Sequence, residues 1–147
     1  MGCPLIRETK LSSQFVDDTI REYGSQIWIQ LQHDPLRVGT PDIYVVTDGI
    51  FIPMESKKVY KDSGQSILAH PFKRMQIKRM HDLLKVRAYP IGLIFYKLEK
   101  RYILPLAIRE DGQISMEEYL KLPLFDWEVI RNAATKAHCS GCNRRQV

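Results

Sequence analysis

The first hydrophobic pattern of the chain has the period of a helix. Its apolar members recur at helical spacing and are Leu11, Phe15, Val16, Ile20 and Tyr23. This spacing predicts a helix over about residues 10–23, and Gly24 is a typical helix end. The apolar run at 27–31 then predicts a first strand.

The next pattern is a pair of apolar runs on either side of Asp48-Gly49. This dipeptide favours a two-residue hairpin turn, because both of its residues tolerate positive φ. Counted outward from such a turn, the numbers of paired residues sum to 97, which sets Val45 opposite Ile52. Pro53 cannot donate a ladder hydrogen bond, so it indicates an edge position or a bulge that would shift the pairing by one residue.

The open end of this hairpin brings charged side chains together. By the same count Asp42 faces Glu55, and Lys57 points to the same side as Glu55 because it follows two residues later. Opposed Cβ atoms lie about 5 Å apart, so the two carboxylates repel unless a cation lies between them. A divalent ion such as Mg²⁺ takes one or two carboxylates and keeps positions for water or phosphate. A lysine beside it can hold an attacking water or offset negative charge in a transition state.

A second helix is predicted after Pro71, over about residues 72–86. One face of it carries Gln76, Met80, Leu83 and Leu84, and the remainder carries Lys73, Arg74, Lys78 and Arg79. A glutamine on a buried face needs a hydrogen-bond partner, for which a water or a phosphate would serve. An ordinary helix glutamine satisfied by the protein itself is the alternative.

The last third of the chain predicts a second hairpin and two helices. The hairpin pairs 91–96 with 101–104 through residues 97–100. Ser115 opens a capping box for a short helix, and Asp126 can cap a last helix through about His138. Residues 1–138 then form a single domain, and residues 139–147 form a tail.

Composition limits the cellular setting and indicates a polyanionic partner. The 147 residues carry a net charge of +5, but residues 57–101 hold twelve basic and three acidic residues, a net +9. A basic block next to paired carboxylates favours a nucleic acid over an ordinary solvated face. The chain has three cysteines, no apolar run of membrane-spanning length and no secretory signal pattern. We therefore expect a cytoplasmic protein without a disulfide framework, in the cell or in the host of a phage.

The hairpin residues resemble a known motif. Pro41-Asp42, followed thirteen residues later by Glu55-Ser56-Lys57, is similar to the motif of the PD-(D/E)XK nuclease superfamily. The resemblance implies an α/β, restriction-endonuclease-like mixed sheet flanked by helices. It also implies Mg²⁺, for which Mn²⁺ would substitute, held by Asp42, Glu55 and the Ser56 carbonyl, with Lys57 as the catalytic base or water-positioning residue.

A second stretch narrows the resemblance. The spacing Phe-x-x-x-Gln-x-x-x-Met at 72–80, followed by an apolar strand, is similar to bacterial and phage Holliday-junction resolvases. It implies that Gln76 belongs to the active site and that a glutamate of the first helix joins it. Glu8 is preferred for that role over Glu22. The basic or Ser/Thr-rich element that often precedes the motif Asp in that branch has no match here, and no stalk insertion fits.

DNA is the partner that this resemblance implies, with four-way junctions as the expected substrate of a homodimer. The expected phosphate contacts are Lys58, Lys61, Lys73, Arg74, Lys78 and Arg79. Phe125, Trp127 and Ile130 are candidates for the dimer contact, although they could equally cap the sheet.

Alternative functions remain at this stage. They are a homing, repair or phage replication-repair endonuclease of the same fold, and a DNA-binding module without catalysis. An RNA-binding role is less expected, because we predict no exposed aromatic residues in strands. Cys139 and Cys142, with His138 before them, provide three of the four ligands of a zinc site, although frayed tails are common.

Overall fold

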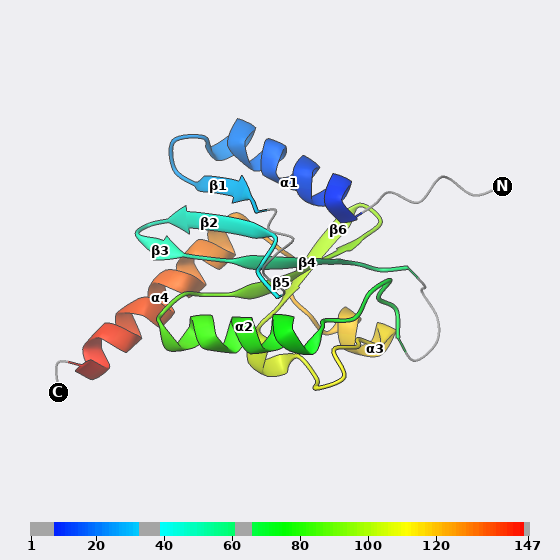
Figure 1. Cartoon of the computed structure of the whole chain (residues 1–147). Helices are drawn as coiled ribbons and strands as arrows, with labels where there is room; N and C mark the ends of the chain where they lie inside the picture. Colours follow the sequence, from blue (N-terminus) through cyan, green and yellow to red (C-terminus); the bar gives the residue numbers. More distant parts are fainter. Residues whose placement is uncertain (1–7, 33–38, 61–65, 146–147) are drawn as a thin grey trace.

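The computed structural model describes residues 8–32, 39–60 and 66–145, with side chains for residues 9–139 of these ranges (Figure 1). The helices and strands are α1 (Glu8–Tyr23), β1 (Trp28–Leu31), β2 (Ile43–Thr47), β3 (Ile50–Phe51), β4 (Met54–Lys58), α2 (Arg74–Lys85), β5 (Ile91–Tyr96), β6 (Glu99–Ile103), the 3₁₀ turn η1 (Pro105–Ala107), α3 (Met116–Leu120) and α4 (Trp127–Arg145).

The strands form one mixed sheet in the order β1-β2-β4-β5-β6, with β3 paired to β2. Only β4 and β5 are parallel among the described pairs, and α2 makes the crossover between them. Side chains alternate between the two faces, so Leu93 belongs to one apolar cluster and its neighbour Ile94 to the other. Helices α1 and α4 pack on the Leu93 face, and α2 and α3 on the Ile94 face.

The predicted hairpin and its register are confirmed. Asp48 and Gly49 form the turn with φ of 55° and 74°, and Val46 pairs with Phe51. Pro53 divides the returning strand into β3 and β4. Beyond it Ile43 pairs with Met54, which preserves the same count from the turn. The interruption therefore does not shift the register.

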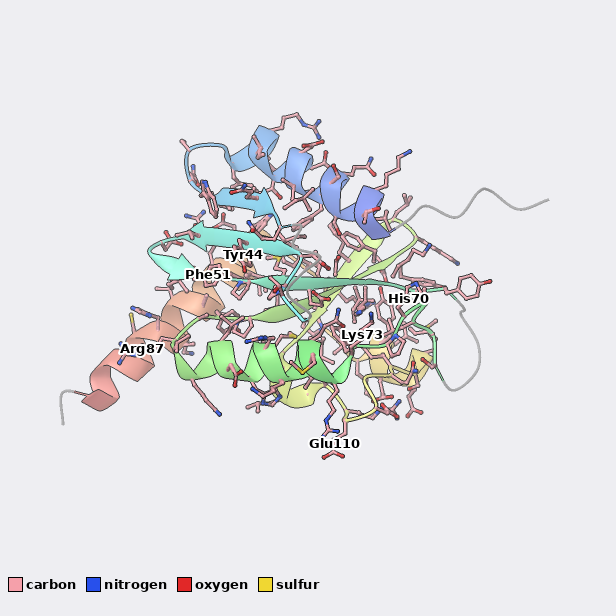
Figure 2. The ribbon with its side chains drawn as sticks, viewed as in Figure 1. Tyr44, Phe51, His70, Lys73, Arg87 and Glu110 are labelled. Atoms are coloured by element: carbon pink, nitrogen blue, oxygen red, sulfur yellow. The ribbon has the colours of Figure 1, made fainter. Side chains whose placement is uncertain are left out.

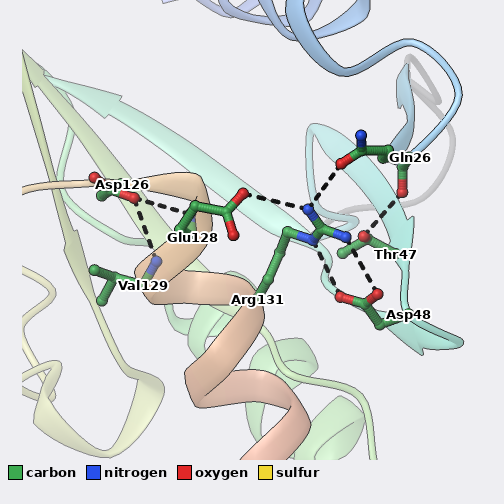
Figure 3. Close-up of polar contacts among 7 residues, drawn as sticks. All are labelled: Gln26, Thr47, Asp48, Asp126, Glu128, Val129 and Arg131. Atoms are coloured by element: carbon green, nitrogen blue, oxygen red, sulfur yellow. Dashed lines mark hydrogen bonds and ion pairs between the residues drawn. The ribbon is translucent and has the colours of Figure 1, made fainter.

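Arg131 of α4 holds the hairpin turn in place (Figure 3). Its Nε and Nη2 donate to both carboxylate oxygens of Asp48 at 3.1 and 3.2 Å, and its Nη1 donates to Gln26 at 3.2 Å. The Thr47 hydroxyl donates to the Gln26 carbonyl at 3.0 Å. The turn is thus tied to the last helix and to the loop before β1.

The boundaries of two other elements differ from prediction. The second strand of the last hairpin begins at Glu99, because Lys97 takes a positive φ of 53° and makes a tighter turn. The Asp126 cap is confirmed by its hydrogen bonds from the following backbone N–H groups, but α4 continues to Arg145 rather than ending near His138. The Ser115 capping box is also confirmed.

Of the two alternatives for Phe125, Trp127 and Ile130, the structure supports the cap. Trp127 and Ile130 are only 7% and 0% exposed, because they pack against the sheet, and Phe125 is partly buried against the same cluster.

The prediction that no exposed aromatic residues occur in strands is wrong. Strand positions do carry accessible aromatic rings: Trp28 is 51% exposed, and Tyr44 and Phe51 are half-buried. Of their strands, β1 is an outer strand of the sheet, β2 lies next to it, and β3 pairs with β2.

Candidate active site

Asp42 lies where β2 begins and where β2 and β4 separate. Within the described residues these strands pair only at Ile43 and Met54, which leaves a gap at their ends. The backbone N–H and the hydroxyl of Ser56 donate across it to Oδ2 of Asp42 at 3.0 and 2.8 Å. The Asp42 carbonyl accepts from the N–H of Gln32 at 2.6 Å. The Asp42 carboxylate is therefore fixed against β4.

Gly39 anchors the segment before Asp42 on α2. Its φ is +86°, and a Cβ at this position would lie 2.7 Å from the carbonyl oxygen of Met75. Glycine is required on both grounds, because other residues disfavour this φ and would collide with the helix. The contact sets Asp42 next to the helix that carries Gln76.

Gln76 connects the two charged side chains of β4. Its Nε2 donates to Oε1 of Glu55, while its Oε1 accepts from Nζ of Lys57 at 2.9 Å. The same oxygen accepts from the backbone N–H of Lys73 at 2.8 Å and so caps α2. The structure thus brings Gln76 into one network with Glu55 and Lys57, although about twenty residues of sequence separate Gln76 from both.

The Lys57 side chain is 3% exposed and lies against an aromatic ring. Its Nζ is 5.4 Å from the centroid of Phe72. This arrangement depends on Gly92, where a Cβ would come within 2.7 Å of the Phe72 ring. The Phe72 ring therefore packs directly on the backbone of β5 and lies next to the ammonium group of Lys57.

Burial and charge strongly affect Glu55. Loss of solvent and, next to it, the negative charge of Asp42 raise its pKa, and the positive charge of Lys57 lowers it; together they bring the pKa to about 9. Without a cation the Glu55 carboxyl group therefore keeps its proton at neutral pH. This electrostatic conflict is what the predicted opposition of two carboxylates implies.

These side chains line one cavity of about 520 Å³. Its lining residues are Thr9, Ser12, Leu31, Gln32, Asp42, Glu55, Ser56, Lys57, His70, Lys73 and Gln76. Figure 2 shows His70 and Lys73 near one another at the entry to α2. The cavity therefore draws on α1, the ends of β1, β2 and β4, and the N-terminus of α2.

The donor set fits a hard divalent cation. Among the residues that the structure describes, Oε2 of Glu55 is buried and has no hydrogen-bond partner, and the nearby Asp42 carboxylate raises the pKa of Glu55. Two carboxylates are a typical protein contribution to a Mg²⁺ site. Among the described residues no group of three or more His, Cys, Asp or Glu side chains could hold a metal. Further ligands would be backbone, water or substrate oxygens, and the Ser56 carbonyl as one of them stays a prediction.

The first helix reaches the cavity through its N-terminal turn. Ser12 donates to the Ser56 hydroxyl at 2.7 Å, and Thr9 lines the cavity. Glu8 begins α1, but its side chain lies outside the described part of the chain. Glu22 is exposed at the far end of the helix, about 15 Å along its axis from Ser12, and lines a different cavity. Glu22 is therefore not part of this site, and the role of Glu8 stays a prediction.

The predicted basic contacts lie mostly on the outer side of α2 and at its start. Lys73, Arg74, Lys78 and Arg79 are exposed, and Lys78 pairs with Asp82 at 3.0 Å. Lys58 is half-buried at the end of β4, and Lys61 lies outside the described residues. Lys73 lines the cavity, whereas Arg74 and Lys78 line a second hollow and Arg79 a third. Contact of these residues with DNA stays a prediction.

Several cavity residues were not predicted from the sequence. Ser12 lies four residues before Val16, so a polar residue on the apolar stripe was the available signal. His70 had no such signal, because a polar loop residue before a proline is usually only exposed. Its position depends on how the loop returns to α2.

The zinc site predicted from His138, Cys139 and Cys142, to which Cys3 or another chain could add the fourth ligand, stays a prediction. His138 and Cys139 lie within α4, and the Cys139 side chain is exposed. The side chains of Cys142 and Cys3 lie outside the described residues, so a ligand set including them stays a prediction. None of the described helices is long and apolar enough to cross a membrane.

Comparison with known proteins gives a fold but no sequence family. Neither the family models nor the curated proteins compared with the sequence give a match. Solved structures do match, among them Hjc, a Holliday junction resolvase from the archaeal hyperthermophile Archaeoglobus fulgidus. That match has a TM-score of 0.56 and 11% sequence identity, and covers 76% of this chain and 94% of the other. The chain has a restriction-endonuclease-like fold. At this identity the likeness extends to the fold alone.

Proposed function

We propose that the chain is a metal-dependent endodeoxyribonuclease, and that its substrate is branched DNA, above all the four-way junction. The observation that carries the nuclease proposal is the pair of half-buried Asp42 and buried Glu55, with Lys57 held beside it by Gln76. The junction specificity is supported by the sequence resemblance and by the fold that the chain shares with a resolvase.

The proposed mechanism assigns each side chain a task at one phosphodiester bond. Asp42 and Glu55 would bind the cation, which supplies Lewis acidity toward a phosphoryl oxygen and favours hydroxide at neutral pH. Lys57 would hold the attacking water or offset the charge that develops on the phosphorus oxygens. Gln76 would orient Lys57, and through its amide also the water or the phosphate.

The first prediction separates catalysis from binding. Asp42→Asn and Glu55→Gln should each abolish cleavage and leave DNA binding intact. Asp42→Asn should also tighten binding, because it removes a negative charge that faces the phosphate. Lys57→Ala should reduce the cleavage rate and spare cation binding. Synthetic four-way junction, flap and linear duplex would be incubated with Mg²⁺, with Mn²⁺ or with EDTA, and the products resolved on a denaturing gel.

A control for the metal site is Glu110→Gln, which removes an exposed carboxylate outside the cavity and should keep metal-dependent cleavage (Figure 2). It is not a control for DNA affinity, because Glu110 lines a hollow with Arg74 and Lys78. Cleavage that persists in EDTA would contradict the metal-dependent mechanism. Equal rates on junction and duplex would leave a nuclease but favour the homing, repair or phage replication-repair alternative. Binding without cleavage under all conditions would favour the DNA-binding module.

A further inference from the structure

On the side where α2 packs, the described elements leave part of the sheet exposed. Four side chains of β1, β2 and β3 project there and form a surface that we call the aromatic strip: Trp28, Tyr44, Val46 and Phe51. Trp28 and Val46 are 51% and 40% exposed, and the other two are half-buried. Figure 2 shows Tyr44 and Phe51 on this face, beside α2 and not beneath it.

The sheet register makes these residues neighbours. Trp28 pairs with Val46 across β1 and β2, and Val46 pairs with Phe51 across β2 and β3. The Tyr44 and Phe51 rings are in contact, with centroids 5.1 Å apart and planes at 90°. Three aromatic rings therefore share one continuous, solvent-accessible surface that spans three strands.

The aromatic strip begins next to the candidate active site. Tyr44 follows Asp42 by two residues on the same face of β2, about 7 Å along the strand. Between Tyr44 and α2 lies a hollow of about 500 Å³ that Arg79 also lines. Asp82 lines it too, but Lys78 balances its charge at 3.0 Å. A strand of DNA passing this hollow would meet a guanidinium on one side and aromatic rings on the other.

We propose that the aromatic strip stacks unpaired bases of the DNA strand that lies next to the cleaved bond. Accessible rings on a sheet, together with neighbouring cations, suit single-stranded nucleic acid, because every base has a flat π-face and every nucleotide a phosphate. The proposal rests on the proposed function for the location of the cleaved bond. It supplies a physical basis for a preference for DNA with unpaired bases, such as a flap or a junction whose central base pairs are opened, since paired duplex keeps its bases stacked internally and presents none to the strip.

The test measures binding without cleavage. In EDTA, the wild type would be titrated with a duplex that contains a gap of three unpaired nucleotides, and with the fully paired duplex of the same sequence. Tyr44→Leu and Phe51→Leu should each weaken binding to gapped DNA about tenfold, the share of one stacked base, and leave duplex binding unchanged. Tyr44→Phe and Phe51→Tyr keep a ring and should bind as the wild type does.

Trp28 provides a direct reporter of the contact. The chain has two tryptophans, and Trp127 is only 7% exposed. The fluorescence quenched by gapped DNA should therefore be lost in Trp28→Phe. Leu106→Ala, at an 80% exposed site in η1 outside the strip, is the matched control and should bind both DNAs normally. Circular dichroism would verify that each variant is folded.

Three outcomes would overturn the proposal. The first is unchanged affinity for gapped DNA in both leucine variants. The second is an equal loss for gapped and paired DNA. The third is a wild-type dimer that Phe51→Leu dissociates in sedimentation without DNA, which would make the strip an interface between two copies. Binding is measured without metal, so a wild type that never cleaves DNA contradicts the proposed function alone. Leucine variants that cleave normally and bind gapped DNA normally contradict the stacking role of the aromatic strip alone.

Discussion

At the scale of single residues, Glu55 carries the strongest physical conflict in the molecule. Its side chain is 3% exposed, faces a second carboxylate, and within the described part of the chain accepts a hydrogen bond at Oε1 but not at Oε2. Burial is the largest cause that raises its pKa to about 9, followed by the charge of Asp42. Such a group is stable as a neutral acid, or as an anion next to a cation, but not as an isolated anion.

This conflict predicts how stability depends on pH. Because the folded pKa of Glu55 lies near 9 and the ordinary value near 4.5, the folded protein holds a proton that the unfolded chain has lost between these values. Glu55 thus contributes its stability below the ordinary pKa, and that contribution is lost as pH rises toward the folded pKa. Urea unfolding in EDTA should show a lower free energy of unfolding at pH 8.5 than at pH 6, and Glu55→Gln should reduce this difference. An equal change in the free energy of unfolding between pH 6 and pH 8.5 in the wild type and in Glu55→Gln would contradict the raised pKa of Glu55.

The same shift predicts proton release on metal binding. Mg²⁺ requires the ionised carboxylate, so binding at neutral pH should release about one proton and become tighter as pH rises. Calorimetric titration in two buffers with different ionisation enthalpies would measure the number of protons. Glu55→Gln should abolish the release, whereas Glu110→Gln should retain it. Binding of equal affinity at pH 6 and pH 8.5 would contradict this expectation.

Only part of the site could be predicted at this scale. Asp42, Glu55 and Lys57 follow from one hairpin, whose turn dipeptide sets the register of both strands. Gln76 follows from the polar position on an apolar helix face. His70 and Ser12 come from elements whose approach to the hairpin depends on tertiary packing, so periodicity alone could not bring them to the cavity.

At the scale of elements, the hairpin register depends on its turn, and the turn is tied to α4. The Arg131 side chain is 16% exposed and grips both oxygens of Asp48, which is 41% exposed. A bidentate contact of this kind stabilises the fold more than an exposed ion pair does, although the partial exposure of Asp48 weakens the attraction. The sequence indicated the turn, but its partner lies 83 residues away and could not be inferred from local pattern.

Arg131→Leu should therefore lower the free energy of unfolding by about 1 kcal/mol. The matched control is Arg21→Leu, which breaks the exposed pair with Asp18 and should cost little, because both of its side chains are more than half exposed. Urea denaturation of both variants at low and high salt would give the comparison. Equal effects of the two substitutions on the free energy of unfolding would mean that the contact between Arg131 and Asp48 does not stabilise the turn.

The basic side of α2 gives a second prediction at this scale. If Lys73, Arg74 and Arg79 each contact one DNA phosphate, each alanine substitution should reduce the slope of log affinity against log salt by about 0.9. Lys78→Ala should have a smaller effect, because Asp82 already pairs with Lys78 at 3.0 Å. Filter binding from about 50 to 200 mM salt covers the sensitive range. An unchanged slope in the quadruple alanine variant would assign this face to solvent or to a partner protein.

At the scale of the whole molecule, the sequence indicated an α/β fold with helices around a mixed sheet, and the solved resolvase shares this fold. The sequence did not predict which face of the sheet each helix covers. Trp127 and Ile130 look alike as candidates for a core or for an interface, because both are apolar on one helix face. Only the packed structure decides, since α1 and α4 together close over the same side of the sheet.

The last prediction concerns how two nicks are made in one junction. Each chain provides one set of Asp42, Glu55 and Lys57, so resolution by two opposed nicks requires two chains, and a symmetric dimer is the simplest assembly. On a plasmid with an extruded cruciform, wild-type protein should give linear product. An excess of Glu55→Gln should form mixed dimers and shift the product to nicked circles, because one subunit then cuts alone. Light scattering would report the dimer directly. A monomer that linearises the plasmid despite excess inactive protein would show that two nicks do not require paired sites.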